Sequence, residues 1–207
     1  MALYNLNIPV TDDEVRTLRI GDMVSFSGSA WTCRSRLHRY IFDEGHRLPF
    51  STENQNVLIH VGPIIVRENN AWRLVSFTPT SSIRFEKWGA RSVEEWKLKA
   101  IVGKTTMGPA TMAAMKRFGC VHLAPVGVTP ELFVDRITVK DVYLFDELGS
   151  IEASWQLHLE KIGPFIVDID TEGNNYFEQL DRVIDDNRKD AYKKLGIPED
   201  FEYTKLY

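Results

Sequence analysis

Apolar runs alternate with short polar segments along the whole chain, and their lengths predict strands and helices. In the first half we expect one helix, at about 33–42, and strands at 23–27, 57–61 with a continuation at 64–66, and 72–77. Thr32 is the expected cap of that helix, and Gly28 with Ser29 is expected to end the strand before it. The first half is therefore predicted to be β-rich.

The second half alternates between helix and strand periods. Helices are predicted at about 93–99, 107–118 and 176–195, and a short one is expected to start at Thr129. Strands are predicted at 100–102, 120–124, 141–145, 155–159 and 165–169. Beyond Leu195 we expect an irregular tail. The sequence predicts an α/β fold, and we expect one domain over 1–207 with a helical C-terminal extension from about 176, because no Gly-, Ser- or Pro-rich linker divides it.

Composition removes several classes of function. Hydrophobic residues make up 43% of the 207 residues, enough for a core, and the net charge of -4 without a basic run argues against a nucleic-acid partner. The apolar runs are too short to span a membrane, and we expect a cytoplasmic protein because the first residues lack a secretion signal.

Only two cysteines are present, Cys33 and Cys120, and they lie far apart in the sequence. Iron–sulfur clusters usually need more thiolates than that, and the chain has no CxxC or HExxH motif. We therefore expect no metal ligand in this chain, so that any metal centre would come from another chain.

A hydroxyl-rich loop, Phe77-Thr78-Pro79-Thr80-Ser81-Ser82-Ile83-Arg84, follows a predicted strand. Hydroxyls donate single hydrogen bonds and arginine offers a bidentate fork, a combination that suits a carboxylate. A polar turn with a surface arginine explains the loop equally simply.

Lys104 stands in a second candidate segment, Ala100-Ile101-Val102-Gly103-Lys104-Thr105, which resembles the end of a phosphate-binding loop. That motif requires a glycine where this chain has Leu98, so we reject a nucleotide triphosphatase. Lys104 still precedes a predicted helix N-terminus, where an anion is favoured, although a solvent-exposed lysine remains an alternative.

Arg34 and His38 lie one helical turn apart, and His38 is a candidate acid or base. A histidine satisfied by its neighbours is the simpler alternative, and His60 and His122, inside apolar runs, are interpreted as structural. The sequence shows no carboxylate pair and no Ser-His-Asp arrangement. Together with Thr80 and Lys104, the two arginines Arg34 and Arg84 suit a small dicarboxylate, which describes half of an active site.

These segments, in this order, resemble the β subunit of L(+)-tartrate dehydratase and the C-terminal domain or β subunit of class I, iron–sulfur-dependent fumarases. The resemblance covers about 15–175. It is carried by Ser27-Gly28, Thr32-Cys33-Arg34 with His38, Gly62-Pro63-Ile64, Pro79-Thr80-Ser81-Ser82 with Arg84, Val102-Gly103-Lys104, Met107-Gly108-Pro109, Glu147-Leu148-Gly149 with Trp155, Gly163-Pro164, Ile169-Asp170-Thr171 and Gly173-Asn174-Asn175.

The resemblance implies a swivelling β/β/α domain and a partner α subunit that carries a 4Fe-4S cluster, in an assembly of two α and two β subunits. The implied reaction is reversible addition or removal of water on a small hydroxy-dicarboxylate, either L-tartrate to oxaloacetate or malate to fumarate, with a cluster iron as Lewis acid. It further implies that Arg34, Arg84, Lys104 and Ser81 bind substrate, and that Thr80 and His38 are catalytic.

Several positions depart from the family pattern. Ser35 replaces the usual aspartate, Thr78 a glycine, Phe85 a methionine, and Thr105 and Thr106 glycines. The departures at Ser35 and Thr78 leave open a second function, a non-catalytic anion-binding or assembly module that keeps the fold. Lys104 leaves open a third, a nucleotide-binding protein that uses this lysine.

Overall fold

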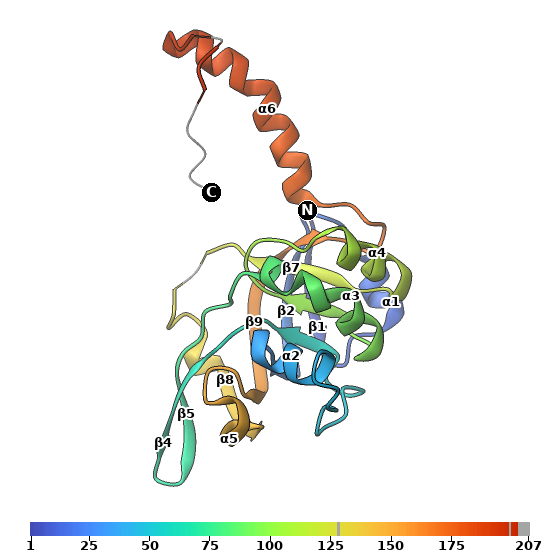
Figure 1. Ribbon diagram of the computed structural model, residues 1–207, viewed down its shortest axis with the longest axis vertical. Coiled ribbons are helices and arrows are strands. Elements are labelled where there is room, and N and C mark those ends of the chain that lie inside the picture. Colours follow the sequence, from blue (N-terminus) through green and yellow to red (C-terminus); the bar gives the residue numbers. More distant parts are fainter. Residues whose placement is uncertain (128, 199, 203–207) are drawn as a thin grey trace.

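The computed structural model describes residues 1–127, 129–198 and 200–202. Its strands are β1 (Leu3–Asn7), β2 (Met23–Thr32), β3 (Val57–Ile59), β4 (Ile64–Glu68), β5 (Ala71–Ser76), β6 (Ala100–Val102), β7 (Val121–Pro125), β8 (Ile137–Tyr143) and β9 (Ser154–Ile169). Its helices are α1 (Asp12–Thr17), α2 (Ser35–Phe42), α3 (Glu86–Glu95), α4 (Pro109–Phe118), α5 (Phe145–Leu148) and α6 (Tyr176–Leu195), with short 3-10 helices η1 (Ser82–Phe85) and η2 (Val134–Arg136). The prediction of a mixed α/β fold is confirmed (Figure 1).

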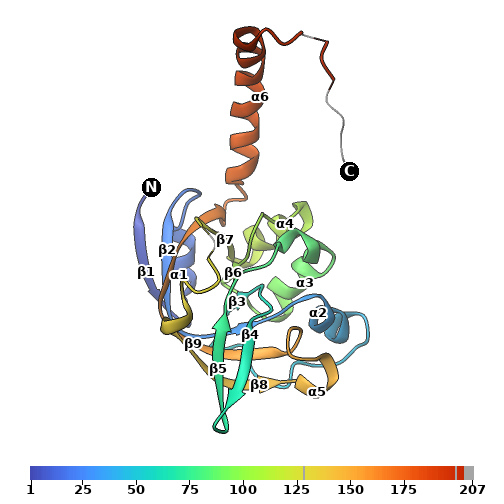
Figure 2. The same ribbon diagram turned by 90° about the vertical axis from the view of Figure 1, so that its left-hand side faces the viewer.

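A seven-stranded sheet in the order β1-β2-β3-β6-β7-β9-β8 forms the body of the molecule. Strands β1, β2, β3, β6 and β7 run parallel, and β9 is antiparallel to β2, β7 and β8. Because β9 pairs with β2 as well as with β7, the sheet closes on itself through these two strands. The strands therefore enclose a small barrel-like core, and β4 with β5 forms a separate hairpin that projects from it (Figure 2).

Alternation along the short central strands divides the apolar residues into two clusters. Val57 and Ile59 of β3 pack inside the barrel, whereas Leu58 packs with the helices outside it. Ala100 and Val102 of β6 repeat this pattern, since successive side chains of a strand point to opposite faces. The outer cluster includes residues of α2, α3 and α4, so these helices cover the outside of the central strands.

Several predicted elements have different bounds. Strand β2 does not stop at Gly28 but continues to Thr32, so Thr32 is a strand residue rather than a helix cap. Gly28 has a φ of +115° at an irregularity of the β2–β9 register, where a glycine accommodates a bulge without breaking the pairing. The helix expected at 93–99 is α3, which begins at Glu86 and ends at Glu95.

The other differences lie at the ends of the chain and in its later strands. The two strands expected at 155–159 and 165–169 are one continuous strand, β9, and the strand expected at 141–145 is β8, which is followed by α5. The segment after Thr129 forms turns and then η2 rather than a helix. The first two elements were not predicted: β1 extends the sheet, and α1 begins with a capping box between Thr11 and Glu14.

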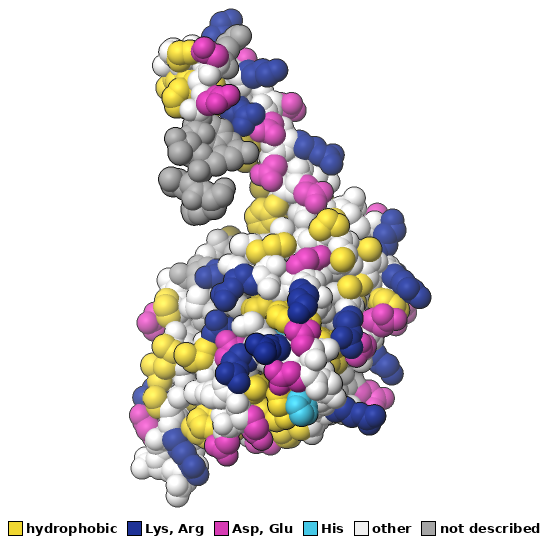
Figure 3. Space-filling view, in the orientation of Figure 1, with side chains coloured by type: hydrophobic (Ala, Val, Ile, Leu, Met, Phe, Trp, Pro, Cys, Tyr) yellow, Lys and Arg dark blue, Asp and Glu magenta, His cyan; other side chains and the backbone are white. Residues whose placement is uncertain are grey.

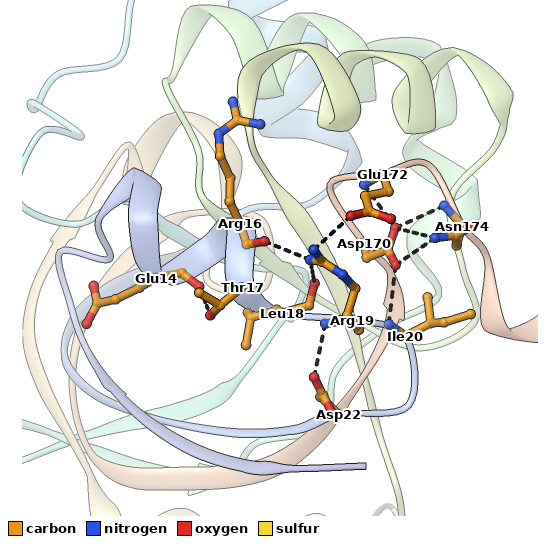
Figure 4. A network of polar contacts seen from close by, with 10 residues as sticks. All are labelled: Glu14, Arg16, Thr17, Leu18, Arg19, Ile20, Asp22, Asp170, Glu172 and Asn174. Atoms are coloured by element: carbon orange, nitrogen blue, oxygen red, sulfur yellow. Dashed lines mark hydrogen bonds and ion pairs between the residues drawn. The ribbon is translucent and has the colours of Figure 1, made fainter.

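Helix α6 has the bounds that the sequence predicts and extends away from the body (Figures 1 and 2). The loop before it is ordered by Asp170, whose carboxylate accepts hydrogen bonds from the backbone N–H groups of Glu172 and Asn174 (Figure 4). Arg19 forms an ion pair with Glu172 across 2.7 Å and so ties this loop to the segment before β2 (Figure 4). The last five positions of the predicted irregular tail lie outside the described residues. Among the described helices, none combines the length and the apolar character that crossing a membrane requires.

Candidate substrate site at the carboxyl edge of the sheet

The predicted site residues follow the carboxyl ends of neighbouring parallel strands. Arg34 comes two residues after β2, His60 directly follows β3, and Lys104 comes two residues after β6. Since β3 lies between β2 and β6, Arg34 and Lys104 flank its end, with starting points roughly 10 Å apart. The carboxyl edge of parallel strands is where α/β proteins commonly bind ligands, because the loops there converge.

The hydroxyl-rich loop runs across this edge and is fixed by its backbone. Thr80 N–H donates to the carbonyl of His60 (2.7 Å), and Lys104 N–H donates to the carbonyl of Thr80 (2.9 Å). Ser82 N–H in turn donates to the carbonyl of Lys104 (2.8 Å), and Ser81 pairs with Lys104 as an isolated parallel bridge. The structure therefore brings Thr80, Ser81 and Lys104 together, although more than twenty residues separate the two segments.

Two cationic side chains of this region have no partner among the described residues. Lys104 is partly exposed, and Arg84 is exposed on η1. Within the described residues, neither side chain forms a hydrogen bond or an ion pair. A cation without an internal counter-ion remains available for an external anion.

Arg34 is held more tightly. Its side chain is 19% exposed and its Nε lies 3.6 Å from a carboxylate oxygen of Glu152. A Cβ at Gly62 would come within 2.5 Å of Arg34 Nη1, so the guanidinium rests directly on this glycine, just beyond β3. Gly62 thereby leaves room for Arg34, and Arg34 Nε is buried with no hydrogen-bond partner among the described residues.

His38 does not reach the exposed part of the site. It is fully buried, with its ring stacked near Phe85 and Trp88, and its Nδ1 lies 3.0 Å from the carbonyl oxygen of Arg34. Burial lowers the pKa of His38 to about 4, and the hydrogen bond to the Arg34 backbone raises this pKa by a smaller amount. A neutral His38 therefore donates through Nδ1 and supports the backbone from which Arg34 projects.

A buried chain of hydrogen bonds lies beneath the hydroxyl-rich loop. Asp168 Oδ1 lies 2.6 Å from His122 Nδ1, His122 Nε2 lies 2.8 Å from Ser82 Oγ, and Ser82 Oγ lies 2.9 Å from His60 Nδ1. All four side chains are buried. The absence of a Ser-His-Asp arrangement, predicted from the sequence, is wrong: β7, β9 and η1 bring Ser82, His122 and Asp168 together.

One assignment of protons satisfies these hydrogen bonds in sequence. In it, His122 donates from Nδ1 to Asp168 and accepts the Ser82 proton at Nε2. In the same assignment Ser82 Oγ accepts from His60 Nδ1, and His60 Nε2 is a buried acceptor with no partner in the part of the chain that the structure describes. Burial and the neighbouring His38 and His122 keep the pKa of His60 well below its ordinary value, which agrees with a neutral ring.

The sequence did not predict this chain of hydrogen bonds, because its residues come from separate elements of the fold. His60 and His122 each interrupt an apolar run, which is the signal that marks them, but β3 and β7 both neighbour β6 only in the folded sheet. Full burial excludes direct contact between these groups and a substrate. Their place directly under Thr80 and Lys104 makes them supports for the loop.

Glu86 fixes the other side of the site. Its carboxylate accepts hydrogen bonds from the backbone N–H groups of Gly108, Ala110 and Thr111 and from the Thr111 hydroxyl, at 2.7–3.2 Å. The first turn of α4 is thus capped by a side chain from α3, which accounts for the missing cap at Gly108. The N–H groups at the N-terminus of α4 are satisfied by Glu86 and are not open to an anion. The anion site expected at this helix N-terminus, beside Lys104, is therefore not formed.

The described residues offer no ligand set for an iron–sulfur cluster. Cys33 and Cys120 are free and fully buried, and burial raises the pKa of both thiols. Within residues 1–127, 129–198 and 200–202, no three His, Cys, Asp or Glu side chains gather in a way that could hold a metal ion. The described residues therefore do not fit a resident cluster.

Comparison with known proteins identifies relatives over nearly the full chain. A protein of Methanocaldococcus jannaschii, provisionally named L(+)-tartrate dehydratase subunit beta, is 32% identical over 197 residues, which are 93% of this chain and 96% of the relative. L(+)-tartrate dehydratase subunit beta of Escherichia coli K12 is 30% identical over 191 residues, 92% of this chain and 94% of the relative.

A longer relative matches only in part. A Geobacillus stearothermophilus protein, provisionally named class I fumarate hydratase, is 30% identical over 181 residues, which are 87% of this chain but 34% of the relative. The family described as Fumarase C-terminus matches residues 2–180. These matches confirm the resemblance inferred from the short motifs. On this evidence, the chain belongs to the Fumarase C-terminus family.

Proposed function

We propose that this chain is the β subunit of an iron–sulfur-dependent hydro-lyase that adds or removes water on a small hydroxy-dicarboxylate. The observation that carries the proposal is the convergence of Thr80, Ser81 and Lys104 at the carboxyl edge of the sheet, with Arg34 beside them. The names of the relatives support the reaction class, with L-tartrate to oxaloacetate or malate to fumarate as candidate reactions. In this proposal the fold is a swivelling β/β/α domain and the protein is cytoplasmic.

The cations bind the two carboxylates of the substrate. Lys104 and Arg84 have no internal counter-ion among the described residues, so a substrate carboxylate supplies one. Arg34 presents its guanidinium from a fixed position over Gly62, and the Ser81 hydroxyl adds a hydrogen bond. Positive groups at these places also stabilise the extra negative charge that develops when a proton leaves the carbon next to a carboxylate.

Thr80 is the proposed proton-transfer residue. Its backbone is clamped between His60 and Lys104, which fixes the hydroxyl at the edge of the sheet. A hydroxyl alone is a weak base, so Lys104 or a carboxylate of the partner subunit must assist it. His38 acts on the reaction through Arg34, whose carbonyl it binds, and is a positioning residue in this proposal.

The partner in this proposal is an α subunit that holds a 4Fe-4S cluster, in an assembly of two α and two β subunits. The lack of a ligand set among the described residues supports a cluster held by another chain. This chain then contributes the substrate-binding cations, and the complete site forms between the two subunits.

The test is turnover of the complex, purified anaerobically, on L-tartrate, malate and fumarate. Arg84→Ala and Lys104→Ala should each lower kcat/KM by about 10- to 100-fold, because each removes a charge-assisted hydrogen bond worth roughly 1.5–3 kcal/mol. Lys87→Ala is the matched control, since Lys87 is an exposed cation on the neighbouring α3 that pairs with Asp43. Near-normal rates in both site variants, with folding intact, would rule the assignment out.

A non-catalytic anion-binding module is the second candidate, favoured by Ser35 and Thr78, which depart from the family pattern. Anaerobic purification from the native source separates the two functions. A co-purifying subunit with iron and sulfide supports the enzyme, whereas a chain that elutes alone and free of iron supports the module.

A further inference from the structure

Helix α6 carries an apolar stripe that its own chain leaves exposed. Among the described residues of α6 none is buried, and the stripe consists of Phe177, Leu180, Ile184, Ala191 and Leu195. Their spacing of three, four, seven and four residues places them on one face of a helix. Leu180 is 38% exposed, Ile184 58% and Leu195 73%, so the large apolar side chains of the stripe lie open to solvent.

The base of α6 is anchored to the body. Asn175 caps the helix by accepting hydrogen bonds from the N–H groups of Phe177 and Glu178, and its amide donates to Thr106 Oγ1 (3.0 Å). The ordered loop around Asp170 precedes this cap (Figure 4). The helix therefore leaves the body from a fixed point and extends away from it (Figures 1 and 2).

The charges of α6 divide along its length. Its first ten residues carry Glu178, Asp181 and Asp185 against Arg182, a net charge of -2. Its last ten carry Arg188, Lys189, Lys193 and Lys194 against Asp186 and Asp190, a net charge of +2. Figure 3 shows acidic and basic side chains together along the visible face of the helix. A helix with such halves is complementary to a copy of itself that runs in the opposite direction.

We propose that α6 pairs antiparallel with α6 of a second copy of this chain. A two-fold axis at the middle of the helix sets Leu180 against Ala191 of the second copy, and Ile184 against its Asn187. The same alignment brings Asp181, at the edge of the stripe, opposite Arg188 of the second copy, and does so twice because the contact is symmetric. A parallel pair would bring like-charged halves together and is disfavoured.

This interface is separate from the match that defines the family. The family match ends at residue 180, so most of the stripe and all of the basic half lie beyond it. The proposal therefore does not depend on the proposed reaction and can fail or hold independently of it.

The first experiment is sedimentation equilibrium of the full-length chain. Wild type should dimerise in the micromolar range, and Ile184→Glu should weaken the dimer at least tenfold. Because Ile184 is exposed, this variant should keep the far-ultraviolet circular dichroism and the Tm of the monomer. A wild-type chain that stays monomeric at 100 micromolar (about 2 mg/mL), or a dimer that Ile184→Glu leaves intact, would overturn the proposal.

Disulfide trapping tests the direction. The pair Leu180→Cys with Ala191→Cys should give a cross-linked dimer, whereas either change alone should give little, because neither position faces itself in an antiparallel pair. The matched control is Arg182→Cys with Lys189→Cys, which has the same symmetry on the opposite face and should not cross-link. Efficient cross-linking of Leu180→Cys alone would indicate a parallel pair and contradict the proposal. The proposal would also be contradicted if Ile184→Glu lost a co-purifying subunit while its self-association stayed unchanged.

Discussion

Ser82 Oγ lies 2.8 Å from Nε2 of His122 while its own backbone N–H donates to the carbonyl of Lys104. One residue thus connects the buried Asp168–His122 pair to the loop that carries the proposed substrate cations. The serine hydroxyl accepts from His60 as well, so its proton and one of its two lone pairs are used inside the protein. Ser82 therefore acts as a structural link and not as a nucleophile.

Ser82→Ala should destabilise the fold and disturb the site together. The change leaves buried nitrogens of His122 and His60 without their partner, and each unsatisfied group costs about 1–3 kcal/mol. Urea unfolding should show this loss, and turnover of the complex should fall because Lys104 loses its support. The matched control is Ser92→Ala, since the buried Ser92 hydroxyl bonds only a carbonyl in its own helix and its removal should be nearly neutral. Equal effects of the two variants would contradict the linking role of Ser82.

Stability should fall with acid between about pH 6.5 and pH 4. The pKa of His38 is about 4 in the folded chain against 6.5 when it is unperturbed, so the unfolded chain binds the extra proton over this window. Folding free energy present above pH 6.5 is therefore lost as the pH falls, by on the order of 3 kcal/mol for His38, and the lowered pKa of His60 acts in the same direction.

Urea unfolding at a series of pH values measures this slope. His38→Gln removes one titrating group and should make the curve flatter between pH 6.5 and pH 4, whatever it does to stability at neutral pH. An unchanged slope in that variant would mean that His38 is not held neutral by burial.

Gly62→Ala should affect binding more than folding. The added Cβ would meet Arg34 Nη1 at 2.5 Å and Ile151 Cγ2 at 2.6 Å. Both side chains can move aside at small cost, because that of Arg34 is long and flexible and Ile151 is 51% exposed. We expect a Tm close to wild type but a KM at least tenfold higher, because the guanidinium leaves its position. Gly127→Ala is the control, since a Cβ at Gly127 meets no atom within 4 Å. An unaltered KM in Gly62→Ala would place Arg34 outside the substrate site.

Glu86→Gln should weaken the packing of α3 on α4. Glu86 accepts four hydrogen bonds at the start of α4, and loss of the charge at a helix N-terminus costs about 0.5–2 kcal/mol. The comparison variant is Glu95→Gln, which breaks only an exposed ion pair with Arg91 and should cost less than 1 kcal/mol. The difference in urea midpoint between the two variants checks this prediction, and equal midpoints would contradict it.

The local sequence was enough to predict the bounds of those helices and strands whose start and end signals lie among neighbouring residues. Strand β6 has the predicted bounds, and α4 begins with Pro109 and ends before Gly119, which has a φ of +67°. Helix α6 also has its predicted bounds, because a 20-residue amphipathic pattern is a strong signal. The short motifs likewise sufficed to identify the family, since each can be read without knowledge of its neighbours in space.

Only the tertiary structure decided which of these pieces meet. The pairing of β9 with both β2 and β7 closes the sheet, and it carries Asp168 to His122 across 46 residues. Ser82 reaches His122 over 40 residues, and its hydroxyl completes a network that no local pattern contains. The physical reason is that side-chain periodicity reports which face of an element is apolar, whereas contacts between buried polar groups depend on strand order and register, which long-range packing sets.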